Sequence, residues 1–424
     1  MSSQQKFLLL QGPASPFFKK LGLELIKMGH LAWKVNFCGG DKVMSWGKLP
    51  QFNFRGAYKD FNSWLTALFK EYQFTHIILF GDTRPLHIEA IKVAKSFHCQ
   101  VYVYEEGYLR PDWITMEKNG VNGYSELILK NKDPSWLSSY KPLQENYSPQ
   151  DSGISTKLRL LQDLIYRLAT FLLLPFYPFY KTYRPRNAFI EYLGWAKRIP
   201  LKFLKKNNEE ITINNLIMQN KFYYFLPLQL NSDAQIRTHS NFSNIAHMLA
   251  TVLQSFAHHA KDDSLLVIKN HPFDTGLINY KHIVKKLCYE YNVKFDRVLY
   301  IENGHVPTLI NHAKGVVLVN STVGMSALFH ECPTIALGES IYSLPNLTYQ
   351  ESLDSFWLNF YKPNIKLYRK LELFLMENNQ INGNFYTKKG ISMSIKGSLK
   401  ILGLSYCLPL SDCVNTLLTS PAKM

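Results

Sequence analysis

The chain has 424 residues, of which 46% are hydrophobic and 19% charged, so it can bury a large core and is expected to form two or three domains rather than a disordered chain. Lys and Arg number 48 against 32 Asp and Glu, and the formal net charge of +16 indicates an anionic partner: nucleic acid, an anionic membrane, or a phosphorylated or carboxylated small molecule. Aromatic residues make up 14%, more than a Lys-rich nucleic-acid binder needs, which favours a membrane surface or a sugar.

The first 104 residues alternate short apolar runs with amphipathic stretches, a pattern typical of βα units around a parallel sheet. The first apolar run has four residues, too few for the apolar region of a signal peptide. Because ligands bind at the carboxyl ends of parallel strands, the polar residues that follow these strands are candidate site residues. The predicted strands are 7–10, 31–37, 76–80 and 101–104, and the predicted helices are 16–28, 61–72 and 88–97.

Residues 151–206 form a basic segment with 11 Lys or Arg and three Asp or Glu, so its net charge is 11 − 3 = +8, half of the excess of the whole chain. Its apolar run at 168–180 is too short to span a bilayer and contains two prolines. Two interpretations remain open. The segment either lies on anionic lipid, or forms a basic helix pair at the domain seam with its Phe and Tyr residues in the core.

A second series of strands and helices begins near residue 221, and polar clusters again follow the strands. Two α/β halves predict two Rossmann-like domains that face a cleft, at 1–150 and 216–360. The connecting segment is then 151–215, and the tail 361–424, which matches no motif, is expected to pack across both domains. The strands of the second half are predicted at 222–226, 265–269, 298–301, 315–319 and 334–337, with helices at 244–260 and 279–291.

The six cysteines show no CxxC spacing. Reduced thiols in a cytosolic protein are therefore a simpler interpretation than a zinc site or a disulfide framework. The sequence also lacks GxxxxGK[ST], a GxGxxG after the first strand, and HExxH. These are the signatures of P-loop nucleotide binding, dinucleotide binding and zincin metalloproteases, so the sequence does not favour these three classes.

Two acidic clusters follow strands of the first half. Asp82 either caps the next helix or forms a polar site with Arg84 and His87. Glu105 and Glu106 follow the strand at 101–104, and extended geometry predicts that at most one of them faces the cleft.

A carboxylate in the second acidic cluster can act as a general base or as a nucleophile toward an anomeric carbon. Arg110, five residues after Glu105, would hold a carboxylate or phosphate of the substrate. The alternative is a solvated acid pair at a sheet edge.

Two clusters in the second half favour an anion site. Lys269 and His271 stand at the end of a buried strand and provide a cation and a hydrogen-bond donor. Ser321 and Thr322 stand in a hydroxyl-rich turn before a helix. Each cluster alone has a structural explanation, but together they predict phosphate binding. The polar loop at 229–239 is as readily a solvated loop as a site.

Five stretches in chain order resemble bacterial capsule polysaccharide biosynthesis and export proteins of the KpsS/LipB type: GDTRPLH (81–87), EEGYLRPDWIT (105–115), PLQLNSDAQI (227–236), KNHP (269–272) and NSTVGMSALFHECPTIALGESIY (320–342). The resemblance implies a GT-B-like α/β fold with an N-terminal acceptor-side domain and a C-terminal nucleotide-sugar domain. It also implies a retaining β-Kdo glycosyltransferase that transfers Kdo from CMP-Kdo to lyso-phosphatidylglycerol without a cofactor or metal.

The resemblance also implies roles for individual residues. Glu106 would be the nucleophile, with Asp82 as the second candidate and Glu105 as a further catalytic acid. Arg84, His87 and Arg110 would bind substrate anions. The basic segment would hold the enzyme on the inner face of the cytoplasmic membrane, near other capsule assembly proteins and without nucleic acid. The alternative is a non-catalytic component that binds lipid-linked glycan. The donor CMP would be held by Lys269, His271, Asn320, Ser321, Thr322, Gln229 and Asp233.

Overall fold

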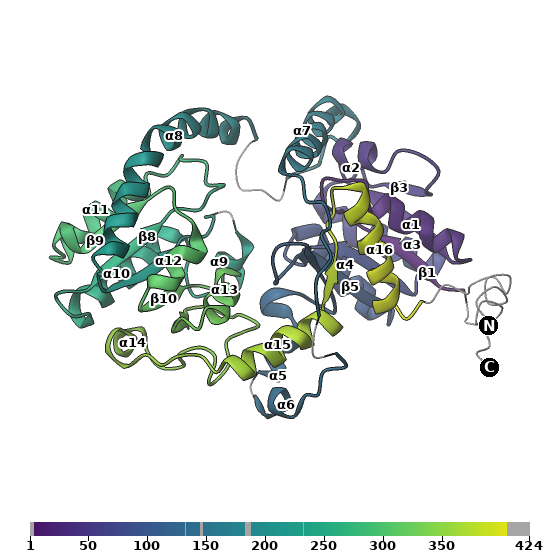
Figure 1. Cartoon of the computed structure of the whole chain (residues 1–424). Helices are drawn as coiled ribbons and strands as arrows, with labels where there is room; N and C mark the ends of the chain where they lie inside the picture. The colour runs from purple at the N-terminus through teal and green to yellow at the C-terminus, as the bar shows by residue number, and fades with distance from the viewer. Residues whose placement is uncertain (1–3, 132, 145–146, 183–187, 232, 405–424) are drawn as a thin grey trace, which may run out of the picture.

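A computed structural model describes residues 4–131, 133–144, 147–182, 188–231 and 233–404. The chain forms two lobes side by side, each with helices packed around one β-sheet (Figure 1). The predicted α/β architecture, with two Rossmann-like halves in a GT-B-like arrangement, is confirmed.

The N-terminal lobe contains a seven-stranded sheet in the order β12-β6-β5-β4-β1-β2-β3. The pairs from β5 to β3 are parallel, whereas β6 runs antiparallel to both β5 and β12. The strands are β1 (Lys6–Leu9), β2 (Leu31–Asn36), β3 (Gln51–Asn53), β4 (His76–Phe80), β5 (Gln100–Glu106), β6 (Trp113–Lys118) and β12 (Gln380–Asn382). The helices around this sheet are α1 (Phe17–Lys27), α2 (Gly39–Met44), α3 (Phe61–Tyr72) and α4 (Pro85–Ser96), whereas α5 (Glu126–Lys130) and α6 (Ser135–Ser139) lie at the bottom of the molecule (Figure 1).

The C-terminal lobe contains a five-stranded parallel sheet in the order β11-β10-β7-β8-β9. Its strands are β7 (Tyr223–Pro227), β8 (Leu265–Lys269), β9 (Val298–Ile301), β10 (Gly315–Leu318) and β11 (Thr334–Ala336). Its helices are α9 (Ala234–Thr238), α10 (Ile245–His259), α11 (Tyr280–Glu290), α12 (Val306–His312), α13 (Val323–Phe329) and α14 (Leu353–Asn359).

The residues after 360 return to the N-terminal lobe. Helix α15 (Ile365–Asn378) lies along the bottom of both lobes, β12 adds an edge strand to the first sheet, and α16 (Lys388–Ile401) packs against α1 (Figure 1). The Tyr104 hydroxyl donates to the Ser398 hydroxyl at 2.5 Å, in the buried contact between β5 and α16. The N-terminal sheet is therefore completed by the far end of the chain. Residues 405–424, with Cys407 and Cys413, lie outside the described residues.

The predicted strands and helices agree with the observed ones because each has a clear apolar pattern. In α1, for example, Phe17, Leu21 and Leu25 recur at helical spacing and are all buried. Strands β3, β6 and β12 were not predicted. Strands β3 and β12 have three residues each and no readable period, whereas β6, with six residues, begins within the motif that follows β5 and was not separated from it. The cysteines at 38, 99, 288 and 332 are buried and free, as expected for reduced thiols.

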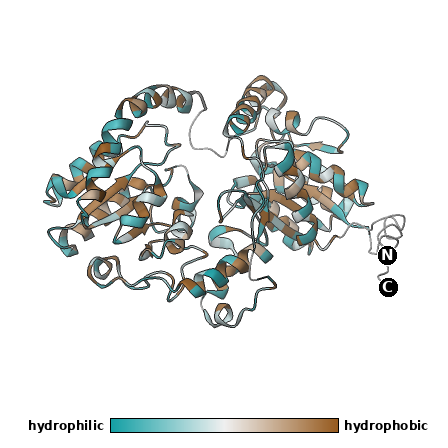
Figure 2. Ribbon diagram, in the orientation of Figure 1, coloured by the Kyte–Doolittle hydropathy of each residue, from teal (hydrophilic) through white to brown (hydrophobic). Residues whose placement is uncertain are grey.

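The basic segment forms two helices, α7 (Thr156–Leu172) and α8 (Ala188–Met218), at the top of the two lobes (Figure 2). Tyr177 is buried, as the interpretation of a packed helix pair expects. Phe171, Phe176 and Phe179 are exposed, as the interpretation of a lipid-contacting segment expects. Arg184 and Arg186 lie outside the described residues. Within the described part of the chain, no helix combines the length and hydropathy needed to cross a membrane.

Helix α7 is held against α2 by two adjacent glycines. A Cβ atom on Gly39 would lie 2.2 Å from the Ala169 carbonyl oxygen, and one on Gly40 would lie 2.7 Å from the Tyr166 carbonyl oxygen. The absence of side chains at these two positions therefore lets α7 approach the N-terminal lobe at backbone contact.

Candidate active site

A cavity of about 410 Å³, the central cavity, lies between the two lobes where β5, β7, β8 and β10 end. This is the position at which parallel sheets present ligand sites, because the loops that follow the strands converge there. The cavity brings together most of the residues that the sequence predicted. They are Glu105, Glu106, Arg110, Gln229, Asp233, Lys269, His271, Asn320, Ser321 and Thr322.

Two carboxylates from the N-terminal lobe reach the central cavity. Both Glu105 and Glu106 line it, contrary to the expectation that only one would, because they are the last two residues of β5 and the chain turns at Gly107 directly after them. Burial raises the pKa of the Glu105 carboxyl to about 7. Glu106 forms an ion pair with Arg159 at 2.9 Å and accepts a hydrogen bond from the Tyr386 hydroxyl at 3.4 Å. The two acids therefore have different environments and are suited to different roles.

Asp82, Arg84 and His87 do not line the central cavity, contrary to the substrate contacts predicted for them. Asp82 is buried and accepts the Val121 backbone N–H at 2.8 Å, and burial raises the pKa of its carboxyl to about 6. Arg84 is buried and donates to the Gln11 side-chain carbonyl at 3.1 Å. His87 is buried, and its Nδ1 lies 2.7 Å from the Gly81 carbonyl oxygen. These contacts hold the turns beneath the site together.

His271 and Lys269 approach the cavity from the end of β8. The His271 Nδ1 accepts the Phe273 backbone N–H at 3.1 Å, and burial lowers the pKa of the imidazole to about 4. A neutral ring that accepts at Nδ1 carries its proton on Nε2, so His271 offers a neutral donor. Burial lowers the pKa of the Lys269 ammonium to about 8, so at neutral pH it still supplies a positive charge.

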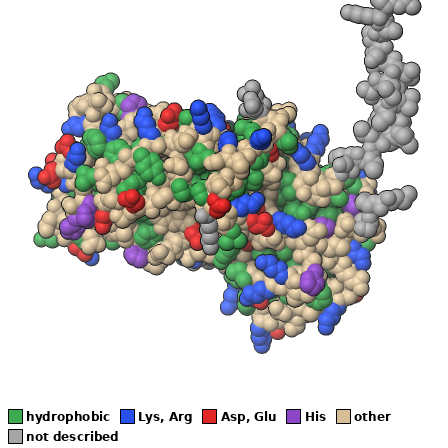
Figure 3. Space-filling view, turned by 90° about the horizontal axis from the view of Figure 1, so that it is seen from below, with side chains coloured by type: hydrophobic (Ala, Val, Ile, Leu, Met, Phe, Trp, Pro, Cys, Tyr) green, Lys and Arg blue, Asp and Glu red, His purple; other side chains and the backbone are tan. Residues whose placement is uncertain are grey.

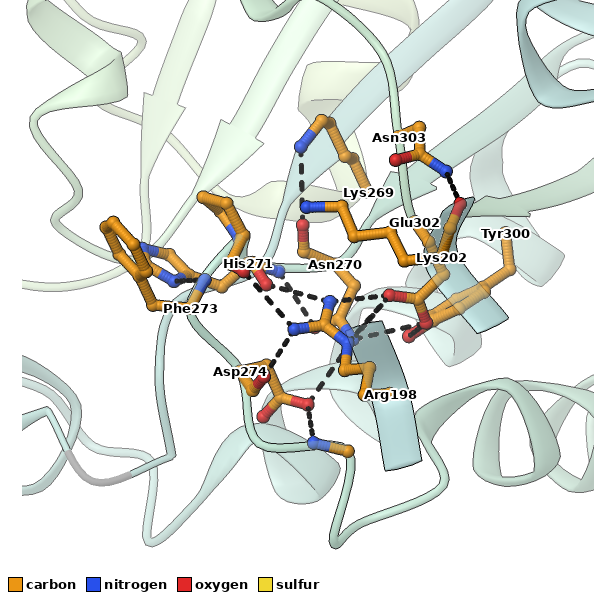
Figure 4. Close-up of polar contacts among 12 residues, drawn as sticks. Arg198, Lys202, Lys269, Asn270, His271, Phe273, Asp274, Tyr300, Glu302 and Asn303 are labelled. Atoms are coloured by element: carbon orange, nitrogen blue, oxygen red, sulfur yellow. Dashed lines mark hydrogen bonds and ion pairs between the residues drawn. The ribbon is translucent and has the colours of Figure 1, made fainter. Parts of the chain in front are cut away.

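The His271 turn is clamped by Arg198, a residue of α8 (Figure 4). The Arg198 guanidinium donates to the carbonyl oxygens of His271 at 3.0 Å and Pro272 at 3.4 Å, and also to that of Asp274. It pairs with Glu302 at 2.5 Å, and Glu302 in turn accepts from the Asn270 amide at 3.2 Å. A buried guanidinium that satisfies three carbonyls of one turn fixes the position of the imidazole on that turn.

Asn320 and Gln229 form a reciprocal pair at the ends of β10 and β7. The Gln229 amide donates to the Asn320 side-chain oxygen at 3.0 Å, and the Asn320 backbone N–H donates to Gln229 at 3.2 Å. Asp233 caps α9 through the Gln235 N–H at 3.0 Å, and burial raises the pKa of its carboxyl. Ser321 accepts the Val323 N–H at 3.2 Å. These contacts position the hydroxyl-rich turn of Ser321 and Thr322 at the cavity.

Several residues of the site had no individual role predicted from the sequence, although His239 ends the polar loop at 229–239. His239 is buried, and neither of its ring nitrogens has a partner among the residues that the structure describes. Tyr342 is buried and donates to the Ser321 carbonyl at 2.5 Å, and a Cβ atom on Gly324 would lie 2.4 Å from its ring. Arg198 was counted only as one cation of the basic segment. No local pattern marks these residues, because each contacts a part of the chain that is distant in sequence or points into a shared loop.

Comparisons with known proteins identify the family. A profile described as "Capsule polysaccharide biosynthesis protein" matches residues 75–386. The chain belongs to this family. It is 35% identical over 387 residues to "Capsule polysaccharide export protein KpsS" of Escherichia coli, and the aligned region covers 91% of this chain and 97% of that relative. It is 33% identical over 395 residues to "Capsule polysaccharide modification protein LipB" of Neisseria meningitidis serogroup A, with 92% and 93% covered.

A similar solved structure is Thermosulfurimonas dismutans KpsC, described as a beta Kdo 2,7 transferase, with a TM-score of 0.44 and 15% identity over 94% of this chain and 100% of that chain. The KpsS/LipB resemblance predicted from the sequence motifs is confirmed by the family profile and by the two relatives. The protein is therefore one of capsule polysaccharide biosynthesis or modification.

Proposed function

We propose that this protein is a retaining glycosyltransferase that moves Kdo from CMP-Kdo to lyso-phosphatidylglycerol and so starts the linker of a capsular polysaccharide. The observation that carries the proposal is the central cavity, where Glu105 and Glu106 of one lobe face the phosphate-binding set of Lys269, His271 and Ser321 from the other. A nucleotide-sugar transferase needs this opposition, because the leaving phosphate and the reacting carbon must be held on opposite sides of the bond that breaks.

In the first step, the Glu106 carboxylate attacks the anomeric carbon of Kdo. The bond from that carbon to the CMP phosphate breaks, and CMP leaves with the electron pair. Lys269 and the Nε2–H of His271 stabilise the charge that develops on the phosphate. Arg110 lines the same cavity and is placed to hold the sugar carboxylate.

In the second step, the acceptor hydroxyl attacks the same carbon and the bond to Glu106 breaks. Glu105 takes the hydroxyl proton, and its pKa of about 7 suits a group that exchanges protons near neutral pH. Two successive displacements at one carbon return its original configuration, which is retention.

Incubation of the full-length protein with CMP-Kdo and lyso-phosphatidylglycerol tests the proposal. The expected products are Kdo-lipid and CMP, and the absence of both over a range of detergents would refute it. Glu106→Gln should reduce the rate by at least about 1000-fold with an unchanged fold, whereas the exposed control Glu290→Gln should not.

Asp233→Asn is the second variant to test, because Asp233 is a third carboxylate in the same cavity. A loss of product there with full activity of Glu106→Gln would transfer the nucleophile role to Asp233. If both variants support normal capsule in cells, the protein acts instead as a non-catalytic component that binds lipid-linked glycan.

The same proposal places the protein on the inner face of the cytoplasmic membrane, with α7 against the lipid. The lysines at 157, 181, 197, 205 and 206 of the basic segment are all exposed, next to exposed apolar side chains on α7 and α8. Other cations of this segment, Arg159, Arg167 and Arg198, pair with acids of the protein. The underside of the molecule instead carries acidic and basic side chains interspersed over both lobes (Figure 3).

Liposome flotation tests the membrane assignment. The double variant Leu164→Gln/Leu168→Gln should lose about 1 kcal/mol of membrane binding for each leucine, since about half of each side chain is exposed. The control Leu358→Gln alters an equally exposed leucine on α14 of the C-terminal lobe and should bind as the wild type. Equal binding of the double variant and the wild type would contradict a role for α7.

A further inference from the structure

A second cavity of about 190 Å³, the side pocket, adjoins the central cavity and shares Glu106 and Arg110 with it. The candidate phosphate-binding residues Lys269, His271 and Ser321 line only the central cavity, so the side pocket gives a separate access to Glu106. The walls of the side pocket come from four parts of the chain. They are the loop and strand at 110–114, the start of α7 at 154–159, Phe273 of the clamped turn, and the returning segment at 383–386.

The side pocket combines cations with aromatic rings. Arg159 stacks over the Tyr386 ring at 4.9 Å while its guanidinium pairs with Glu106. Arg110 is exposed, and within the described ranges its side chain makes no hydrogen bond or ion pair. Trp113 and Phe385 provide buried apolar wall. The chemistry suits a ligand with one anionic group and an apolar part beside it.

Helix α7 is amphipathic in the reverse of the usual sense, with its polar face toward the protein. Tyr166 donates to Asp41 at 3.0 Å, Thr170 accepts the Gly40 N–H at 3.2 Å, and Gln162 donates to the Tyr386 carbonyl at 3.1 Å. The opposite face is apolar and exposed, at positions that share one side of a helix. It comprises Leu160, Leu161, Leu164, Ile165, Leu168, Phe171 and Leu172.

The apolar face and the side pocket meet at the start of α7. Ser155, Thr156 and Arg159 line the pocket, and the next residue, Leu160, begins the exposed apolar face. Ile154 lines the pocket and is itself 53% exposed, so it continues the apolar surface to the mouth of the pocket. A lipid whose chain lies along α7 would therefore have its polar end at Arg159.

We infer that the side pocket is the acceptor subsite, which takes the anionic phosphoglycerol headgroup of a lipid while its acyl chain stays on the apolar face of α7. The lipid phosphate takes the place of Glu106 on Arg159, and the acceptor hydroxyl then points toward the central cavity. This inference rests on the proposed function for the identity of the second substrate. It adds where that substrate binds and which residues recognise it.

Acceptor kinetics test the inference. With lyso-phosphatidylglycerol as the varied substrate, Arg159→Gln should raise the acceptor KM about tenfold or more, as expected for loss of one charge-assisted contact. Ile154→Trp, which narrows the mouth, should do the same without removing a charge. CMP affinity, measured by calorimetry, should stay within about twofold in both variants, since neither residue lines the central cavity. Leu358→Trp is the matched control, because Leu358 is 54% exposed and lies on α14.

Direct binding separates this inference from the proposed function. If the wild type transfers Kdo and both variants keep the wild-type acceptor KM, the side pocket is not the acceptor subsite. Another outcome is that the wild type transfers no Kdo but still binds lyso-phosphatidylglycerol, while Arg159→Gln does not bind it. In that case the proposed reaction is wrong and the lipid site is confirmed. Soluble glycerol phosphate is the second probe. Binding of glycerol phosphate as tight as binding of the lipid would overturn the role of the apolar face.

Discussion

Replacement of Arg198 is the most direct test of how the proposed donor side of the site is built. Its side chain is 9% exposed and donates to the Glu302 carboxylate and to the carbonyl oxygens of three residues in the turn that carries His271. Arg198→Lys retains the charge but cannot span all four acceptors, because an ammonium lacks the planar fork of a guanidinium.

The expected magnitudes follow from these contacts. Loss of two carbonyl hydrogen bonds should lower the free energy of unfolding by about 2 kcal/mol. Arg198→Ala should cost about 3–5 kcal/mol, since it leaves the Glu302 carboxylate without its cation in a partly buried site. CMP must then order the loosened turn, and fixing one or two backbone residues costs about 1–2 kcal/mol each. The dissociation constant of CMP should therefore rise about 5- to 30-fold in Arg198→Lys for each backbone residue that CMP must order.

Calorimetry with CMP and chemical unfolding measure the two effects separately. Arg297→Lys is the matched control, because Arg297 is also 9% exposed and donates to backbone carbonyls, including Ser264 at 3.2 Å, but at the opposite end of β8. The control should lose stability and bind CMP normally. Wild-type CMP affinity in Arg198→Lys, together with lowered stability, would refute the argument that this clamp positions His271.

Three further predictions concern charge and packing. CMP affinity should fall as the pH rises above about 8, approaching tenfold per pH unit, because Lys269 loses its proton. Calorimetry should show that Lys269→Arg no longer has this pH dependence. If the variant keeps the pH profile of the wild type, Lys269 does not bind the phosphate. Burial raises the pKa of Glu117 to about 7, above its unfolded value of about 4, so protonation favours the folded state and up to about 3 kcal/mol of stability is lost as the pH rises from 4 through 7. Urea unfolding should show a flatter pH dependence for Glu117→Gln, and the same slope as the wild type would contradict this. Gly39→Ala should lower the free energy of unfolding by about 1–3 kcal/mol, since the added methyl group meets the Ala169 carbonyl. The variant should also make α7 sensitive to limited proteolysis. A wild-type digestion pattern would disprove the close contact.

The sequence by itself determined the fold class and grouped the cavity residues of the C-terminal lobe. Strong apolar runs such as Leu265–Lys269 define the parallel strands, and the polar residues that follow a strand must lie at the edge where ligands bind. For this reason Lys269, His271, Ser321 and Thr322 could be grouped although they are up to 53 residues apart. The motif order around them was also sufficient to indicate the family that the comparisons later identified.

The tertiary structure alone decided which of the predicted acids line the cavity and which acids the arginines of the basic segment pair with. Asp82 lies just after β4 and Glu106 ends β5, but Asp82 is used to bind the Val121 N–H, whereas Glu106 lines both cavities. In the same way, Arg159 and Arg198 belong to the same basic segment, yet each pairs with an acid from another part of the chain. Spacing along the chain reports only local geometry. These roles depend on contacts between residues about 50 to 280 positions apart. Such contacts are set by the packing of the two lobes and of the returning C-terminal segment.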